Sequence, residues 1–252
     1  MSDYELKKTR YAGMMTLYGR KTVLEILRDN SLNIYRLHLA SSNRHSETIS
    51  EIEALAKDRG LEIRYHEKSV LSRISKNGRQ DQGVAIDIEP DTYQDISNVI
   101  QSRGDLIGLD NITNPQNLGM VIRSVAASPL SGLLLPKKGC ARIDPLVHKA
   151  SAGTLFKADI YHTTTLEHGL KFLKSANFDI VALTGTAETQ LTDLPKTPGR
   201  RRIFLLGNES TGLRQNIRRS CDMEVRIPMA NGVESINVAA AATLVAFREL
   251  FS

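Results

Sequence analysis

The chain has 252 residues, and its 33 lysines and arginines against 28 aspartates and glutamates give a formal net charge of +5. Hydrophobic residues make up 41% and charged residues 24%, a globular composition that excludes a disordered, collagen-like or disulfide-stabilised chain. The longest apolar run, residues 238–247, is far shorter than the roughly 20 residues of a membrane span. Residues 1–10 lack the apolar core of a signal peptide, so we expect a cytoplasmic protein without a membrane partner.

Residues 1–90 are expected to form a small α/β domain. Apolar residues at helical spacing and alternating β-branched residues predict its elements. In chain order these are a helix over residues 19–27, a strand over 34–39, a helix over 48–59, a strand over 61–65, a helical turn over 69–74 and a strand over 83–88. Pro90 ends the last strand, and residues 91–104 are expected to be a linker.

Residues 105–252 alternate strand and helix, which is the pattern of a parallel sheet covered by helices. Strands are expected over residues 105–110, 132–135, 160–162, 178–183, 202–206 and 224–227. Helices are expected over residues 117–127, 146–150, 166–175 and 235–251. We therefore predict an α/β protein with a second, larger parallel-sheet domain.

Positive charge gathers in four short stretches of the chain. They are Arg64, Lys68, Arg73, Lys76 and Arg79; Lys137, Lys138, Arg142 and Lys149; Lys196, Arg200, Arg201 and Arg202; and Arg214, Arg218 and Arg219. Each stretch is either a solvated surface or part of a surface that binds nucleic-acid phosphates. Aromatic residues make up only 5% of the chain and tryptophan is absent, which favours recognition of nucleic-acid backbone and shape over base stacking.

Three loops follow predicted strands at the carboxyl edge of the sheet, where open α/β sheets bind ligands. The first, residues 111–124, carries amides and one guanidinium but no acidic base. The second, residues 207–213, has one carboxylate between Gly207 and Gly212, which permit positive φ and close approach of the backbone to a ligand. The third, residues 227–237, leads into the final helix. None matches a Walker A loop or a G-x-G-x-x-G turn, so neither an NTPase nor an NAD enzyme is expected.

Each polar residue of these loops also has a structural interpretation. Asn117 and Ser235 are of the residue types that cap helices, and Ser235 is a good N-cap candidate for the final helix. Arg123 could have the purely structural role of forming an ion pair, and Glu209 could form one with a neighbouring arginine. The two isolated cysteines and six scattered histidines lack the spacing of a metal site, so no metal is expected.

The three loops together carry a family resemblance. Their ordered segments are Asn114-Pro115-Gln116-Asn117-Leu118-Gly119 with Ile122-Arg123-Ser124; Phe204 to Leu213, which contains Gly207-Asn208-Glu209; and Ile227-Pro228-Met229 with Ser235-Ile236-Asn237-Val238. They resemble the motifs of the SpoU/TrmH family of RNA ribose 2′-O-methyltransferases, in the SPOUT class, and within it the ribosomal-RNA guanosine 2′-O-methyltransferase group. The stretches Tyr18-Gly19-Arg20 and Gln82-Gly83-Val84-Ala85 are similar to the ends of the family's substrate-binding domain, which resembles ribosomal protein L30e.

The resemblance implies a fold, a cofactor and an assembly. The fold would be α/β, with an L30e-like domain over residues 1–90 and a parallel-sheet SPOUT domain over residues 105–252 that ends in a deep trefoil knot. The methyl donor would be S-adenosylmethionine, with no metal. The protein would form a homodimer through the knotted domain, and its partner would be RNA.

The resemblance also implies roles for individual residues. The implied catalytic residues are Arg123, Asn117, Glu209, Ser235 and Asn237. The implied cofactor-binding residues are Thr184, Gly185, Leu206, Gly207, Asn208, Ile227, Met229, Ser235, Ile236 and Val238. RNA binding is expected from Arg20, Arg64, Arg73, Lys76, Arg79, Arg123 and Arg142.

Arg123 stands where the family places its central catalytic arginine. A guanidinium scarcely deprotonates in a protein, so we expect Arg123 to hold the target phosphate and 2′-oxygen rather than to act as a base. Asp81 stands where the ribosomal-RNA group often has histidine, and Pro129 where many members have glycine, which leaves the RNA target open. Ribosomal RNA is the favoured substrate; transfer RNA, or a non-catalytic role in RNA binding or assembly, is the alternative.

Overall fold

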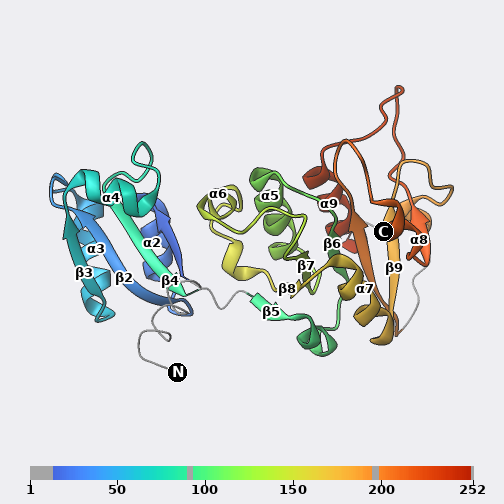
Figure 1. The fold of residues 1–252 in the computed structure, drawn as a ribbon, viewed down its shortest axis with the longest axis horizontal. Helices are drawn as coiled ribbons and strands as arrows, with labels where there is room; N and C mark the ends of the chain where they lie inside the picture. The colour runs from blue at the N-terminus through green and yellow to red at the C-terminus, as the bar shows by residue number, and fades with distance from the viewer. Residues whose placement is uncertain (1–13, 90–92, 195–198, 251–252) are drawn as a thin grey trace. The chain divides into compact units, whose positions relative to one another are not determined.

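The structure is a computed structural model that describes residues 14–89, 93–194 and 199–250. The chain divides into two compact units, residues 1–91 and 92–252, which are described separately (Figure 1). The expectations for residues 1–13, Pro90, residues 91–92, Lys196 and residue 251 of the final helix lie outside the described residues. Of the helices in the described ranges, none is long and apolar enough to cross a membrane.

The first unit is a four-stranded sheet in the order β1-β4-β2-β3. Its elements are β1 (Met15–Tyr18), α2 (Arg20–Arg28), β2 (Asn33–Ala40), α3 (Glu47–Asp58), β3 (Glu62–His66), α4 (Lys68–Ser75) and β4 (Val84–Glu89). β4 pairs antiparallel with β1 and β2, while β2 and β3 are parallel. Every element expected here is present, and β1 is an addition, because four residues are too short to give a readable alternation.

A chain of polar side chains crosses the sheet of the first unit. Register pairs Asp87 of β4 with Thr16 of β1 and Arg36 of β2. Thr16 Oγ1 donates to Asp87 Oδ1 at 2.7 Å, and His38 Nε2 lies 3.0 Å from Asp87 Oδ2. His38 Nδ1 in turn lies 2.9 Å from His66 Nε2. These contacts join β1, β4, β2 and β3 through a single buried carboxylate.

Asp87→Asn is expected to lower the free energy of unfolding by about 3 kcal/mol, since it removes the buried charge that balances Arg36. Burial alone would raise the pKa of Asp87, but hydrogen bonds from His38 and Thr16 outweigh it and hold that pKa below its usual value. The carboxylate therefore stabilises the fold at neutral pH, and this contribution is lost as the pH falls through the lowered pKa. Urea unfolding followed by circular dichroism measures it.

The exposed Asp58→Asn at the end of α3 is the matched control and should leave unfolding unchanged. The difference between Asp87→Asn and the unmodified chain should also shrink in acid, because the wild-type carboxylate is then protonated. Equal stability of the two variants at neutral pH would contradict this account of the first unit.

The second unit is a seven-stranded sheet in the order β11-β9-β10-β6-β7-β8-β5, and each pairing in it is parallel. Its strands are β5 (Tyr93–Asp95), β6 (Leu106–Leu109), β7 (Gly132–Pro136), β8 (Ile160–Thr163), β9 (Phe178–Leu183), β10 (Arg201–Leu206) and β11 (Met223–Val225). Its helices are η1 (Ile96–Gln101), α5 (Pro115–Ala126), α6 (Pro145–Ala150), η2 (Leu155–Lys157), α7 (Leu166–Ser175), η3 (Leu191–Asp193), α8 (Gln215–Arg219), α9 (Val238–Phe247) and η4 (Arg248–Leu250). The prediction of an α/β protein with a parallel sheet is confirmed.

The expected linker over residues 91–104 is wrong. β5 lies within it and pairs with β8 as the edge strand of the sheet. η1 follows at once and buries Ile96 and Val99 in the core. A three-residue strand and one short helix give no periodicity that a sequence pattern can reveal, so only tertiary packing identifies them.

Helices cover both faces of this sheet. On one face, η1, α7 and α8 bury side chains against Ile203 and Leu205 of β10. Alternation turns Phe204 to the opposite face, where Arg248, just after α9, stacks on its ring at 4.2 Å. α5 and α9 pack against each other and lie on that second face (Figure 1). The two helices that carry implied site residues therefore share one layer.

These two helices begin at residues other than those expected. Asn114, and not Asn117, is the N-cap of α5, and its side chain accepts from Gln116 N at 2.8 Å. Asn237, and not Ser235, is the N-cap of α9, and its Oδ1 accepts from Ala239 N at 2.8 Å. Residues 228–237 are not helical, so Ser235 is free of a capping role.

Candidate active site

A cavity of about 300 Å³ lies at the carboxyl ends of β9 and β10. Three stretches of chain and one side chain of α8 line it: residues 183–186, the end of β10 with the loop that follows it, residues within 227–241, and Arg218. Every residue predicted to bind the cofactor lies in its wall, namely Thr184, Gly185, Leu206, Gly207, Asn208, Ile227, Met229, Ser235, Ile236 and Val238. Parallel strands end at one edge of the sheet, which brings these distant segments together.

The loop after β10 is a tight turn over the cavity. Asn208 and Gly212 exchange backbone hydrogen bonds of 3.1 and 2.8 Å. Gly212 has the expected positive φ, at 65°, but Gly207 does not. Gly207 is required for another reason, because a Cβ there would overlap the backbone of Gly212 and Leu213. The expectation of positive φ at both glycines is thus corrected at Gly207.

Three of the implied catalytic residues meet beside this cavity: Asn117 of α5, Glu209 of the loop and Asn237 at the start of α9. Asn117 Nδ2 donates to Glu209 Oε1, and Asn237 Nδ2 donates to the same oxygen at 3.0 Å. Asn237 Nδ2 also lies 3.1 Å from Asn117 Oδ1. Glu209 is therefore held by two amides rather than by an arginine, and Asn117 has a tertiary role rather than a capping one.

The two other implied catalytic residues lie differently. Ser235 is exposed and lines the cavity. Arg123 is also exposed, and its side chain forms no hydrogen bond or ion pair with residues in the described part of the chain. It is separated from Asn117 by about 120° around the axis of α5, so a single chain does not bring the two side chains together.

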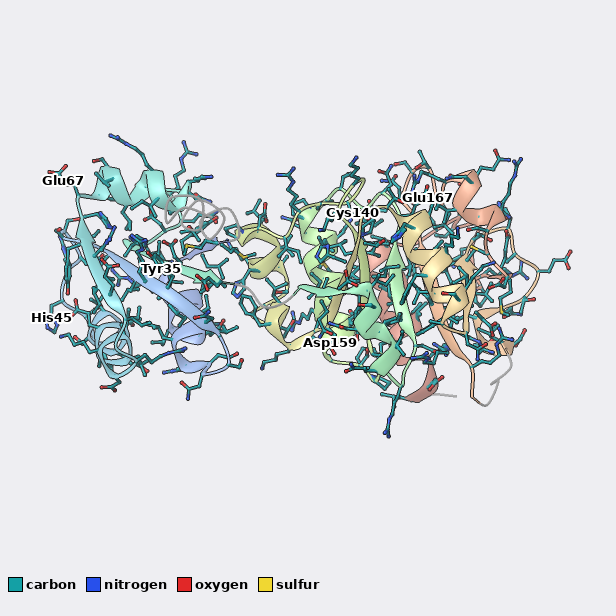
Figure 2. All side chains as sticks on the ribbon, turned by 60° about the horizontal axis from the view of Figure 1, so that its bottom comes forward. Tyr35, His45, Glu67, Cys140, Asp159 and Glu167 are labelled. Carbon is teal, nitrogen blue, oxygen red and sulfur yellow. The ribbon has the colours of Figure 1, made fainter. Side chains whose placement is uncertain are left out.

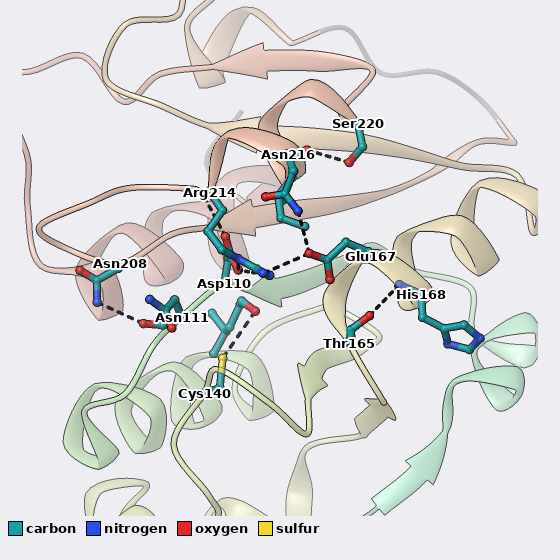
Figure 3. A network of polar contacts seen from close by, with 12 residues as sticks. Asp110, Asn111, Cys140, Thr165, Glu167, His168, Asn208, Arg214, Asn216 and Ser220 are labelled. Carbon is teal, nitrogen blue, oxygen red and sulfur yellow. Dashed lines mark hydrogen bonds and ion pairs between the residues drawn. The ribbon is translucent and has the colours of Figure 1, made fainter.

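A second polar network, shown in Figure 3, anchors the loop from its far end. Asp110, buried just after β6, accepts from Arg214 N at 2.9 Å and from Arg214 Nε at 2.8 Å. Arg214 also pairs with Glu167 of α7 at 3.0 Å, and Asn216 donates to Glu167 at 2.8 Å. Asn208 Nδ2 donates to the carbonyl of Asn111 at 3.1 Å. No sequence signal distinguished Asp110 from other strand residues.

The cavity wall also contains residues that the sequence did not single out for this site. Arg218 of α8 belonged to the fourth basic stretch, and the structure places it in the wall. Its guanidinium forms a bidentate ion pair with Glu224, which holds the pKa of that carboxyl below its usual value. The other additions are Leu183, Thr186, Thr211, Leu213, Glu234 and Ala241.

The residues expected to bind RNA occupy several surfaces. Arg73, Lys76 and Arg79 are exposed on α4 and the turn that follows it, and nitrogen-tipped side chains project there beside Glu67 (Figure 2). Arg64 on β3 forms an ion pair with Glu62 at 2.6 Å, and Arg20 Nε donates to the carbonyl of Gln82 at 3.3 Å. Arg142, in the second unit, is exposed.

Across the described ranges, no three histidine, cysteine, aspartate or glutamate side chains gather as a metal site. Cys140 and Cys221 are free thiols.

Comparison with known proteins identifies the class of protein. Residues 106–247 match the sequence model of the SpoU rRNA Methylase family, and residues 16–94 match that of RNA 2′-O ribose methyltransferase substrate binding. An uncharacterized tRNA/rRNA methyltransferase of Mycolicibacterium smegmatis is 33% identical over 233 residues, which cover 90% of this chain and 73% of the relative. An uncharacterized tRNA/rRNA methyltransferase of Mycobacterium leprae is 32% identical over 235 residues, which cover 91% of this chain and 75% of the relative.

Solved structures agree in fold. The SpoU methyltransferase AviRb of Streptomyces viridochromogenes, in complex with AdoMet, has a TM-score of 0.81 at 23% identity, with 98% of this chain and 94% of that chain covered. The AdoMet-bound rRNA methyltransferase of Sinorhizobium meliloti has a TM-score of 0.76 at 24% identity, with 98% of this chain and 92% of that chain covered. Fold, site and sequence together define an RNA methyltransferase. The chain belongs to the SpoU rRNA methylase family, and the resemblance seen in its sequence is confirmed.

Proposed function

We propose that this protein transfers a methyl group from S-adenosylmethionine to a ribose 2′-hydroxyl of RNA, with large-subunit ribosomal RNA as the favoured substrate. The observation that carries the proposal is the cavity at the ends of β9 and β10, whose wall contains every residue predicted to bind the cofactor. The match of residues 16–94 to a ribose 2′-O substrate-binding domain supports the choice of acceptor. The proposal includes a cytoplasmic location, where this substrate is found.

The wall of the cavity suits S-adenosylmethionine. Leu206, Ile227, Ile236 and Val238 offer apolar surface for the purine. The carboxylate of Glu209 and the hydroxyl of Ser235 offer polar surface for the cationic and hydroxyl groups. When bound, the cofactor supplies an activated methyl group on a sulfonium that is a good leaving group.

The chain's own residues then orient and stabilise the acceptor. Arg123 keeps its charge and holds the target phosphate and 2′-oxygen. A guanidinium beside that oxygen lowers the pKa of the hydroxyl and stabilises the negative charge that develops on it. Asn117 and Asn237 fix Glu209, and through it the loop that covers the cavity. The proton leaves through phosphate or water.

The position of Arg123 supports a homodimer through the second unit. In one chain this side chain points away from Asn117 and Glu209, on a layer where Met120 of α5 and Leu244 of α9 are 49% and 48% exposed. α9 is apolar around its whole circumference, which is typical of a helix covered on all sides. A second copy on this layer would cover the apolar side chains and bring the partner's arginine to the cavity. A trefoil knot formed by residues 227–237 stays a prediction.

Leu244→Glu is expected to convert the dimer to a monomer and to lower methyl transfer at least tenfold, because it buries a charge in the proposed interface. Sedimentation velocity measures the oligomeric state, and the transfer of labelled methyl groups measures activity. Ile100→Glu is the matched control, since Ile100 is 59% exposed but lies on η1 at the opposite face of the sheet. A dimeric, active Leu244→Glu variant would contradict the proposed interface.

Calorimetry and a transfer assay test the proposed function. The protein should bind S-adenosylhomocysteine, and it should transfer label from methyl-labelled S-adenosylmethionine to ribosomal RNA. Transfer RNA is the alternative substrate, because the relatives carry the name tRNA/rRNA methyltransferase. RNA binding without any transfer to either RNA would favour a non-catalytic assembly factor instead.

A further inference from the structure

Arg218 is fixed in the wall of the cavity by two neighbouring elements. Its Nε and Nη2 each lie 2.6 Å from a carboxylate oxygen of Glu224 on β11. Nη2 also donates to Thr186 Oγ1 at 3.0 Å, and Thr184 Oγ1 donates to Glu224 at 3.3 Å. These contacts hold the planar guanidinium in one orientation before any ligand arrives.

One nitrogen of this guanidinium keeps its N–H donors available. Glu224 and Thr186 occupy Nε and Nη2, whereas Nη1 makes no hydrogen bond to residues in the described ranges. Arg218 is 41% exposed at its side chain, so Nη1 can reach a ligand without rearrangement of the wall. A guanidinium whose plane is already fixed loses little conformational freedom when it binds a carboxylate.

The charged side chains of the wall match the charged groups of the proposed cofactor in number and complement them in sign. Arg218 is the one lysine or arginine among the described residues that line the cavity, while Glu209 and Glu234 are its carboxylates. S-adenosylmethionine carries two cationic groups, the sulfonium and the ammonium, and a single anion, its amino-acid carboxylate. Two carboxylates and one guanidinium therefore complement the two cations and one anion of the cofactor.

We propose that Arg218 binds the amino-acid carboxylate of the cofactor and so determines the specificity of the cavity for ligands that carry it. The proposal rests on the proposed function, because it assigns a residue to the cofactor of that function. Glu224 acts as a positioning residue, since it orients the guanidinium from outside the cavity wall.

Calorimetry of the full chain with two ligands tests the proposal. S-adenosylhomocysteine retains the carboxylate, whereas 5′-methylthioadenosine keeps the adenosine and the sulfur but lacks the amino-acid group. Arg218→Ala should weaken the binding of S-adenosylhomocysteine by about 10- to 100-fold and leave that of 5′-methylthioadenosine unchanged. Arg218→Lys should retain part of the preference, because it keeps the charge but loses the planar fork.

The matched control is Arg219→Ala, which removes the adjacent exposed arginine that does not line the cavity and should leave both affinities unchanged. Equal weakening of both ligands by Arg218→Ala and Arg218→Lys would mean that Arg218 only shapes the cavity, and would overturn the proposal. Unchanged affinity for S-adenosylhomocysteine in Arg218→Ala would overturn it as well. A wild-type chain that binds neither ligand would instead overturn the proposed function itself.

Discussion

Arg123→Ala is expected to keep the affinity for S-adenosylhomocysteine and to lower the rate of methyl transfer by about 100- to 1000-fold, the effect of removing one preorganised donor from a developing oxyanion. Arg123 is exposed on α5 and lies outside the cavity wall, so its loss leaves the cofactor-binding surface intact. Calorimetry measures binding, and single-turnover transfer to RNA measures the chemical step. An unchanged affinity together with a lowered transfer rate indicates a residue that acts on the acceptor, whereas a lowered affinity would indicate one that shapes the cavity.

Arg123→Lys is the informative companion variant. It retains a positive charge but not the planar pair of donors that holds a phosphate and a neighbouring oxygen, so its transfer rate should fall between those of wild type and Arg123→Ala. Sedimentation velocity should find all three proteins in the same oligomeric state. An undiminished transfer rate in Arg123→Ala would show that the role assigned to this residue is wrong.

Gly207→Ala is expected to weaken the binding of S-adenosylhomocysteine by about 10- to 100-fold, the range that overpacking gives. The added Cβ would overlap the backbone of Gly212 and Leu213, which cannot move aside as the end of a flexible side chain can. Relief of the overlap would separate Asn208 from Gly212 and open the turn that covers the cavity. Calorimetry measures the affinity, and urea unfolding checks that the two units stay folded.

Gly212→Ala is the control variant, because it also replaces a glycine of this loop with alanine but does not create the steric overlap. A Cβ at Gly212 would meet no atom within 4 Å, so the variant introduces only the strain of a residue with φ of 65°, about 1 kcal/mol. Its loss of affinity should therefore be smaller than that of Gly207→Ala. The reverse order, with Gly212→Ala the weaker binder, would contradict the account of the loop.

Much of the second unit could be predicted because its elements are long and their apolar patterns strong. α7 and β9 have the predicted bounds, and both bury apolar side chains in the core. The parallel arrangement then places the strand ends at one edge, so residues picked out in loops 207–213 and 227–237 meet in a single cavity. Local pattern and sheet topology are sufficient for this part of the site.

The remaining features depend on contacts between residues far apart in sequence. β5 is a strand only because β8 offers it an edge, and Asp110 anchors the loop only because Arg214 folds back to it. Arg218 belonged to a basic stretch that a sequence cannot divide between cavity and solvent. Arg123 and Asn117 belong to the same sequence motif, but their separation around α5 sets the two side chains apart in one chain.

The position of the methyl group on RNA tests the central claim most directly. A 2′-O-methyl group removes the nucleophile that alkali uses to cleave the adjacent phosphodiester, so a labelled ribose should survive alkaline digestion inside a dinucleotide. A methyl group on a base leaves the 2′-hydroxyl free, and the label would appear in mononucleotides. After transfer from methyl-labelled S-adenosylmethionine to ribosomal RNA, we predict that the label is found in alkali-resistant dinucleotides. Label confined to mononucleotides, or no label in any RNA, would contradict the account.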